Sequence, residues 1–318
     1  MGGPLLLTLA GAAAGLALLY FGGEGLVRGA SGLAARLGVS PLAIGLTAVA
    51  FGTSAPELVV SLDAALGGAN DIAVGNVVGS NIANIALILG LAVLLAPAIV
   101  QAKIVRIDAP LVLLVSLLLL AVLADARAGR LEGGLLLAGL VAYTAFTFWE
   151  ARREAPAVQA ELAGAAPPAR AGAGADALRT LAGLAMLVAG GHLLVTAAVA
   201  LATGLGVSQA VIGLTIVAVG TSLPELATSL VAAARGQRDI AVGNVVGSNL
   251  FNILGILGVT ALVQPLGQGA ITWADLGVMT VLAGGLALRL GIRPALGRHD
   301  GALLLAAFAA YTAWLLLR

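Results

Sequence analysis

The chain has 318 residues, of which 60% are hydrophobic and only 10% charged, and its formal net charge is +1. A soluble domain usually carries about 25% charged residues, so this composition excludes an ordinary soluble protein, and the near-neutral charge gives no indication of nucleic-acid binding. The chain contains no Cys, which excludes disulfide bonds and thiolate metal sites.

Hydrophobic segments follow one another along the chain, separated by Gly, Pro and clusters of charge. A helix needs about 20 apolar residues to cross a bilayer. The first segment has no basic region ahead of it and has a counterpart later in the chain, so we interpret it as a retained span rather than a signal peptide. We therefore expect an all-α membrane protein with ten transmembrane helices, near residues 4–27, 41–66, 71–96, 107–124, 131–150, 178–203, 209–234, 239–264, 271–288 and 301–317.

Residues 151–177 separate the fifth segment from the sixth and are rich in Ala, Pro, Gly and charge. This composition predicts a flexible loop, which is too short to hold a folded regulatory domain. Thirteen of the 16 basic residues lie in this loop or in the connections expected on the same side of the membrane. The positive-inside rule then places loop 151–177 in the cytoplasm and both termini on the extracytoplasmic side of the membrane. We expect a multi-pass protein of the plasma membrane.

The stretch DIAVGNVVGSN occurs twice, at 71–81 and, without any change, at 239–249. The same offset of 168 residues relates 38–61 to 206–229, so the chain predicts one five-helix repeat at 1–150 and a second at 178–318. Because five is odd, the second repeat must enter the membrane from the opposite side. Turn 67–71 has no basic residue and its counterpart 235–239 has two, as expected for turns on opposite sides. Inverted repeats are typical of secondary transporters, whose substrate site lies where the repeats meet near mid-membrane.

Two glutamates, Glu57 and Glu225, lie deep inside apolar segments at equivalent positions of the two repeats. A charged residue there costs about 2.5–3.5 kcal/mol on insertion scales, so each is a candidate functional residue. Inversion brings the two to similar depth on facing helices. Two empty carboxylates would repel each other, and a divalent cation between them would remove that repulsion.

Further oxygen donors surround each glutamate in the sequence. Hydroxyl groups three and four positions before the glutamate share its helix face, and Pro56 and Pro224 lack the N–H that would bind a carbonyl one turn earlier. A serine and an asparagine at i and i+4 follow in each duplicated stretch. These donors are Thr53, Ser54, Ser80 and Asn84 in the first half and Thr221, Ser222, Ser248 and Asn252 in the second. Hydroxyl, carboxylate, amide and carbonyl oxygens suit a hard cation such as Ca²⁺ or Na⁺.

The paired motifs GTSAPE with GNVVGSNIAN, and GTSLPE with GNVVGSNLFN, resemble the two alpha-repeats of the sodium/calcium exchanger family in the cation/calcium antiporter superfamily, in its prokaryotic form. They lie within residues 50–84 and 218–252, and the family's ten-span layout fits the whole chain. The resemblance implies a transporter rather than an enzyme, which exports Ca²⁺ driven by Na⁺ entry through alternating access. It implies no cofactor and no obligate protein partner; the protein would interact with Ca²⁺, Na⁺ and the lipid bilayer.

The resemblance also implies a ligand set for the ions. It adds the backbone carbonyls of two alanines to the side chains named above. The complete set is Ala50, Thr53, Ser54, Glu57, Ser80, Asn84, Ala218, Thr221, Ser222, Glu225, Ser248 and Asn252.

Other functions remain to be weighed against Na⁺/Ca²⁺ exchange. Ca²⁺/H⁺ antiport is the main alternative, because two membrane carboxylates can also carry protons, although the Asn-Ala-Ala-Glu-His-type motif of the proton-coupled branch is absent. A channel could use the same ligands, but inverted repeats favour alternating access. An intramembrane hydrolase would need a base near Ser54 or Ser222, and both His residues lie elsewhere in the sequence.

Several polar residues of the repeats receive a structural interpretation. Asn76, Asn81, Asn244 and Asn249 lie off the face shared by the serine and asparagine ligands, so we expect them to form interhelical hydrogen bonds. Glu24 and Arg28 are spaced as an i,i+4 ion pair.

K⁺-dependent members of the superfamily carry an acid at the position of Asn252. The amide at this position therefore predicts exchange that does not require K⁺.

Overall fold

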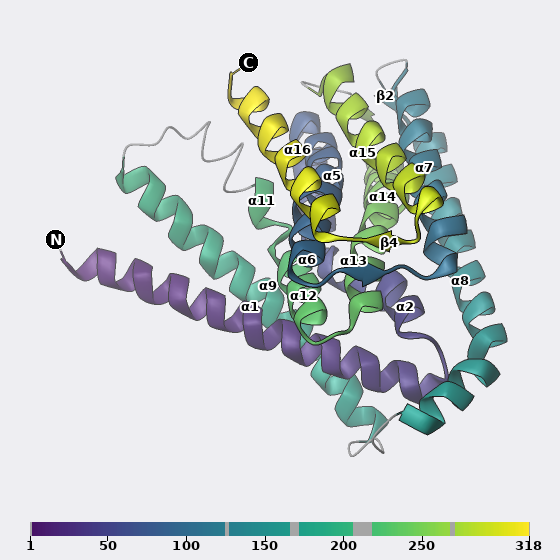
Figure 1. Cartoon of the computed structure of the whole chain (residues 1–318). Coiled ribbons are helices and arrows are strands. Elements are labelled where there is room, and N and C mark those ends of the chain that lie inside the picture. The colour runs from purple at the N-terminus through teal and green to yellow at the C-terminus, as the bar shows by residue number, and fades with distance from the viewer. Residues whose placement is uncertain (1, 125–126, 166–171, 206–217, 268–270, 318) are drawn as a thin grey trace.

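The computed structural model describes residues 2–124, 127–165, 172–205, 218–267 and 271–317 (Figure 1). Within these ranges, eight helices are long and apolar enough to cross a membrane, or nine when one bent pair is taken as a single span. The all-α membrane fold is therefore confirmed. The straight spanning helices are α1 (Gly2–Leu37), α7 (Ala109–Val122, preceded by the π-helix η3, Ile104–Asp108), α8 (Arg130–Ala165), α9 (Ala173–Gly204), α15 (Trp273–Ile292) and α16 (Arg298–Leu317).

Two equivalent spans carry a π-helical insertion in the middle of an otherwise α-helical rod. The first consists of α5 (Asn70–Ile82), η2 (Ala83–Leu89) and α6 (Gly90–Leu95). The second consists of α13 (Arg238–Leu250), η5 (Phe251–Leu257) and α14 (Gly258–Val263). About four-fifths of each is buried inside the protein, 78% and 83% of the most apolar window, so these two spans form the centre of the bundle.

The two glutamate-bearing spans are broken rather than straight. In the first half, α2 (Pro41–Ile44), η1 (Gly45–Val49) and α3 (Ala50–Thr53) are followed by α4 (Ala55–Leu66), and the chain bends by 43° between α3 and α4. In the second half, α11 (Ala218–Gly220) is followed after a two-residue turn by α12 (Leu223–Ala234). Positions 209–217 of the expected seventh span lie outside the described residues, so that span is represented by α11 and α12 alone.

Helix α8 extends further than the sequence predicts. It continues from the expected end near 150 to Ala165, and α9 begins at Ala173, within the segment 151–177 that we expect to be a loop. Residues 151–165 include six Ala, two Arg and two Glu, which are strong helix formers and outweigh Pro156 and Gly164 in the same segment. Adding such residues to an existing helix avoids the cost of a new nucleus. A helix of 36 residues is about 54 Å long, so it reaches beyond a bilayer.

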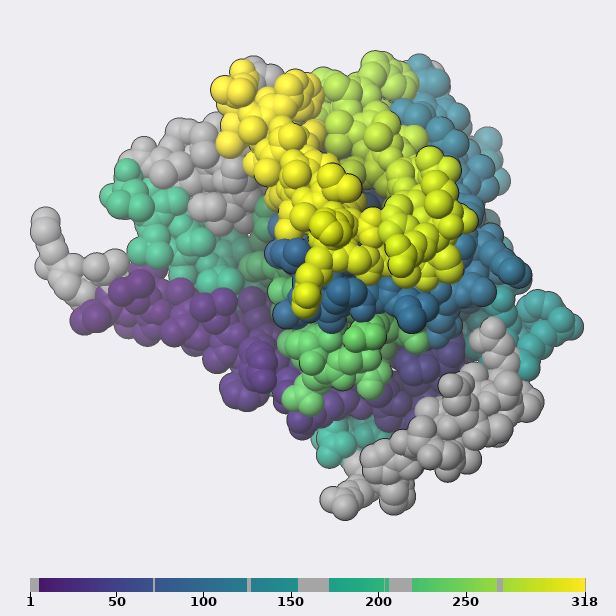
Figure 2. Space-filling model, in the orientation of Figure 1, coloured from purple at the N-terminus to yellow at the C-terminus, as the bar shows by residue number. Residues whose placement is uncertain are grey.

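Helices α1 and α9 pack closely along much of their length and extend together to the left of the bundle in Figures 1 and 2. Gly22 and Gly183 let the two backbones approach: a Cβ on Gly22 would lie 2.9 Å from the carbonyl oxygen of Gly183, and one on Gly183 would lie 2.5 Å from the nitrogen of Leu26. Small residues at membrane helix interfaces allow this kind of packing. Glu24 of α1 pairs with Arg28 at 3.5 Å, as predicted, and also with Arg235 just after α12.

Two short antiparallel pairs of strands link the repeats outside the helices. Strand β1 (Ala98–Ile99) pairs with β4 (Ala295–Leu296), and β2 (Arg127–Ala128) pairs with β3 (Leu266–Gly267). The partners come from different repeats, and the two pairs are related by the 168-residue offset. Because β3 precedes the straight helix α15 and β4 follows it, the two pairs lie at opposite ends of α15 (Figure 1). Their placement at opposite ends is the arrangement that an inverted repeat requires.

Candidate cation-binding site

The helix breaks place one buried glutamate in each half. Ser54 has left the helical conformation, with φ −86° and ψ 7°, and Ser222 matches it with φ −88° and ψ 11°. A proline follows each serine by two residues, so no N–H is available there to continue the hydrogen-bond ladder. Glu57 and Glu225 then fall in the first turn of α4 and α12, each 1% exposed. The amide end of a helix favours negative charge, so the breaks also help to hold the carboxylates.

Each glutamate is contacted by the serine of the opposite half. The Ser54 hydroxyl donates to Oε1 of Glu225 at 2.6 Å, and the Ser222 hydroxyl donates to Oε1 of Glu57 at 3.1 Å. The two halves are therefore joined through the carboxylates themselves. Both serines are buried, so the two hydrogen bonds are shielded from solvent.

The serines of the duplicated stretch complete this set. The hydroxyl oxygens of Ser54 and Ser248 are 3.1 Å apart, and those of Ser222 and Ser80 are 3.3 Å apart. Each pair again joins one half to the other. Four hydroxyls and two carboxylates, predicted separately from the two motifs, are thus brought together in one buried cluster.

Four oxygen atoms of the predicted ligands are buried and have no hydrogen-bond partner among the described residues. They are Oε2 of Glu57, Oε2 of Glu225, Oδ1 of Asn84 and Oδ1 of Asn252. These atoms form two pairs related by the repeat. A buried acceptor without a partner costs free energy, and an unpaired carboxylate costs more than an amide. A hard cation is the partner that such oxygens lack.

The two asparagines of this set lie in the π-helical segments, Asn84 in η2 and Asn252 in η5. A π-helical turn is wider than an α-helical turn and occurs often at functional sites. Sequence periodicity alone does not reveal it, because the pattern of apolar residues continues through both segments. The side-chain nitrogen of Asn252 donates to Oδ1 of Asn81 at 3.3 Å. The side-chain oxygen of Asn252 therefore remains available as a ligand for a cation.

The remaining predicted ligands are engaged within the protein. The Thr53 hydroxyl lies 3.2 Å from the Ala50 carbonyl oxygen and 3.1 Å from Oδ1 of Asn244. The Ala50 carbonyl also accepts from the Ser54 N–H at 3.0 Å. The Thr221 hydroxyl donates to Oδ1 of Asn76 at 3.3 Å. Ala218, the sixth ligand expected in the second half, is the first residue of α11.

Two buried serines were not among the candidates derived from the sequence. Ser61 and Ser229 lie one helical turn after Glu57 and Glu225, are fully buried, and accept hydrogen bonds from Asn76 and Asn244 at 2.9 Å and 3.0 Å. Their signal in the sequence is the i,i+4 spacing from each glutamate and its recurrence at the 168-residue offset.

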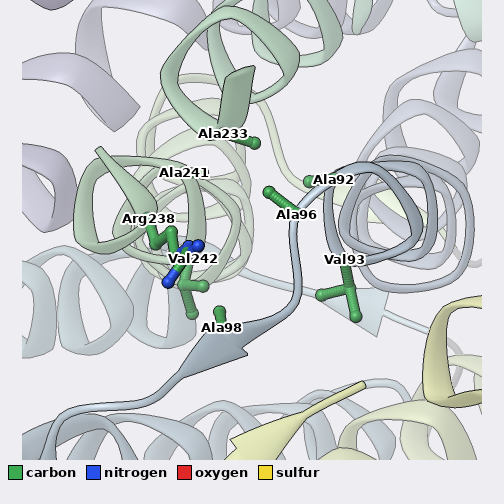
Figure 3. Close-up of a pocket in the computed structure, with 8 residues that line it drawn as sticks. All are labelled: Ala92, Val93, Ala96, Ala98, Ala233, Arg238, Ala241 and Val242. Carbon is green, nitrogen blue, oxygen red and sulfur yellow. The ribbon is translucent and has the colours of Figure 1, made fainter. Parts of the chain in front are cut away.

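A small pocket lies elsewhere, near the first turn of α13 and the end of α6 (Figure 3). Its lining consists of alanine and valine side chains together with Arg238. Such a lining offers hydrocarbon and one positive charge, so it does not suit a cation. The candidate site is therefore the oxygen cluster between the broken helices.

A membrane fold of two inverted halves, with a carboxylate from each half in one buried oxygen cluster, defines the class of cation antiporters. The family model described as sodium/calcium exchanger protein matches residues 7–149 and 177–317. The chain therefore belongs to the sodium/calcium exchanger protein family, whose members are transporters of Na⁺ and Ca²⁺.

Individual relatives agree with this assignment. The chain is 38% identical to the inner membrane protein YrbG of Escherichia coli over 98% of this chain and 97% of that protein. It is 33% identical to the sodium/calcium exchanger MaX1 of Methanosarcina acetivorans over 79% of this chain and 82% of that protein. The structure is similar to that of the sodium-calcium exchanger NCX_Mj soaked with zero Na⁺ and Ca²⁺, with a TM-score of 0.85, 32% identity, and coverage of 98% of this chain and 99% of that chain.

Proposed function

We propose that the protein is a secondary active antiporter that exchanges Na⁺ for Ca²⁺ by alternating access and normally exports Ca²⁺. The observation that carries this proposal is the pair of buried carboxylate oxygens, Oε2 of Glu57 and Oε2 of Glu225, without hydrogen-bond partners among the described residues. Two carboxylates give the cluster a formal charge of −2, which one Ca²⁺ neutralises. Na⁺ ions neutralise the same charge, so the two kinds of ion compete for one site, and such competition is the basis of exchange.

The donor set supports hard cations over softer metals. The described cluster consists of carboxylate, hydroxyl and amide oxygens, and the chain contains no Cys. Oxygen ligands of this kind suit Ca²⁺ and Na⁺. The proposed ligands are those predicted from the sequence, with Glu57 and Glu225 as the charged members.

Ca²⁺/H⁺ antiport is the second candidate, because two buried carboxylates can bind protons in place of Na⁺. A transport assay separates the two. The purified protein is reconstituted into sealed lipid vesicles, and radioactive Ca²⁺ is added to the outside. One sample has an outward Na⁺ gradient at equal pH. The other has a pH gradient in the absence of Na⁺. We expect Ca²⁺ uptake with the Na⁺ gradient only. Uptake with the pH gradient alone would establish the second candidate, and no uptake under either condition would overturn the proposal.

We further propose that both termini and the α4–α5 turn face the outside of the cell, and that the α8–α9 connection and the α12–α13 turn face the cytoplasm. This orientation is supported by the basic residues. Arg235 lies in the α12–α13 turn and Arg238 is the first residue of α13, whereas the equivalent α4–α5 turn and the start of α5 contain no basic residue. Cytoplasmic connections of membrane proteins carry such an excess of Lys and Arg.

A further inference from the structure

Asn76 of α5 connects the two halves without belonging to the proposed ligand set. Its amide nitrogen donates to the backbone carbonyl of Glu57 at 3.1 Å and to the Ser61 hydroxyl at 2.9 Å. A carbonyl oxygen can only accept, so the amide group is held in one orientation. Its oxygen therefore faces the other half, where the Thr221 hydroxyl donates to it at 3.3 Å.

Asn244 of α13 repeats the arrangement with the halves exchanged. Its amide nitrogen donates to the backbone carbonyl of Glu225 at 3.3 Å and to the Ser229 hydroxyl at 3.0 Å. Its oxygen accepts from the Thr53 hydroxyl at 3.1 Å. Asn244 is fully buried, so water does not compete for these bonds. Each asparagine thus holds the glutamate segment of its own half and the threonine of the other.

The bond to Asn244 has a consequence for two proposed ligands. Thr53 has a single hydroxyl hydrogen, and its oxygen lies 3.1 Å from Oδ1 of Asn244 and 3.2 Å from the carbonyl oxygen of Ala50. When the hydrogen points to Asn244, the carbonyl oxygen of Ala50 keeps one lone pair that Thr53 would otherwise occupy. The lone pairs of the Thr53 oxygen are also fixed in direction.

We propose that Asn76 and Asn244 are positioning residues of the ion site, each of which orients the threonine hydroxyl of the opposite half and so couples the ligand geometry of the two repeats. The inference rests on the proposed function, because the affected ligands are those of the transported Ca²⁺. Partners that orient metal ligands typically change metal affinity by about 10- to 100-fold when they are removed. The expected effect of losing either asparagine is therefore on the KM for Ca²⁺ rather than on the maximal rate.

Double-mutant cycles test the cross-repeat contacts, with each cycle providing the control for the other. Asn76→Ala and Thr221→Val are each expected to raise the KM for Ca²⁺ by about tenfold, and the double variant to raise it by clearly less than the product of the two single effects, because the contact between the two residues is lost in both. Asn76→Ala combined with Thr53→Val removes two groups that do not contact each other, so these effects should multiply to about 100-fold. The pair Asn244 and Thr53 should show the same coupling, with Asn244 and Thr221 as the multiplicative control.

Thermal unfolding of every variant without ions separates positioning from folding. Ser116→Ala is the matched control, since Ser116 is buried and donates only within its own helix, to Val112 at 2.8 Å. We expect it to leave the KM for Ca²⁺ unchanged. Where Asn76→Ala does not fold, Asn76→Leu takes its place, because it keeps the approximate volume and still removes the acceptor for Thr221, and the same non-multiplicative result is expected.

Two results would overturn this inference. One is an Asn→Ala variant that lowers the unfolding temperature but leaves the KM for Ca²⁺ within twofold. The other is a Thr–Asn pair whose effects multiply as in the control cycle. Failure of the proposed function is a different outcome, since the wild-type protein would then show no Na⁺-driven Ca²⁺ uptake at all.

Discussion

Replacing Glu225 by Gln is the most direct test of the cation site. The change keeps the shape of the side chain and removes one of the two formal charges in a cluster where Glu225 is 1% exposed. The Ser54 hydroxyl, now 2.6 Å from Oε1 of Glu225, can still donate to the amide oxygen. The perturbation is therefore electrostatic, with little change in packing.

The expected loss of affinity follows from the charge removed. One unit charge about 4 Å from another contributes about 4 kcal/mol at an effective dielectric constant of about 20. Since about 1.4 kcal/mol corresponds to a tenfold change in affinity, Ca²⁺ binding should weaken by at least roughly 1,000-fold. Folding should not suffer, because the variant replaces a buried carboxylate that has an unpartnered oxygen by a neutral amide.

Calorimetric titration of purified protein with Ca²⁺, followed by vesicle transport and thermal unfolding, measures these effects. Glu57→Gln should behave like Glu225→Gln because the site is symmetric. Glu132→Gln is the control for an acid outside the cluster, where the side chain accepts from the N–H of Gly129 at 3.0 Å, and it should bind Ca²⁺ as the wild type does. Wild-type affinity in either site variant would refute the assignment of the two carboxylates.

Three further predictions concern topology, K⁺ and helix packing. With single Cys substitutions in a chain that has none, an impermeant thiol reagent on intact cells should label position Asn70 and not position Arg238; labelling of Arg238 would contradict the proposed orientation. Replacing K⁺ by choline on both sides should leave Na⁺-driven Ca²⁺ uptake unchanged, because the amide of Asn252 leaves no charge to balance an added K⁺, and a large loss of flux would disprove this charge count. Gly183→Val should destabilise the protein by about 1–3 kcal/mol in thermal unfolding, since its Cβ would lie 2.5 Å from a backbone nitrogen of α1, whereas Gly277→Ala, with open space around it, should not.

The sequence was enough to predict the architecture and most members of the candidate site. A buried acid such as Glu57 stands out because the apolar residues around it make its cost large, and the 168-residue offset then identifies Glu225 as its equivalent. Both signals are local, since they depend on spacing along one segment and on comparison of two segments. Because each repeat has an odd number of spans, the sequence also predicts that the second repeat is inverted in the membrane relative to the first.

The partners of these residues could not be derived in the same way. The i,i+3 spacing predicts that Ser54 and Glu57 share one helix face, but in the folded protein Ser54 donates to Glu225 of the opposite half. The chain bends by 43° between α3 and α4, and at this bend the Ser54 hydroxyl points to the opposite half. The π-helical turns at Asn84 and Asn252 and the amide orientations of Asn76 and Asn244 likewise depend on neighbours from distant parts of the chain. Hydrogen-bond partners are chosen by the packing of whole helices against one another, and a pattern within one helix does not contain that information.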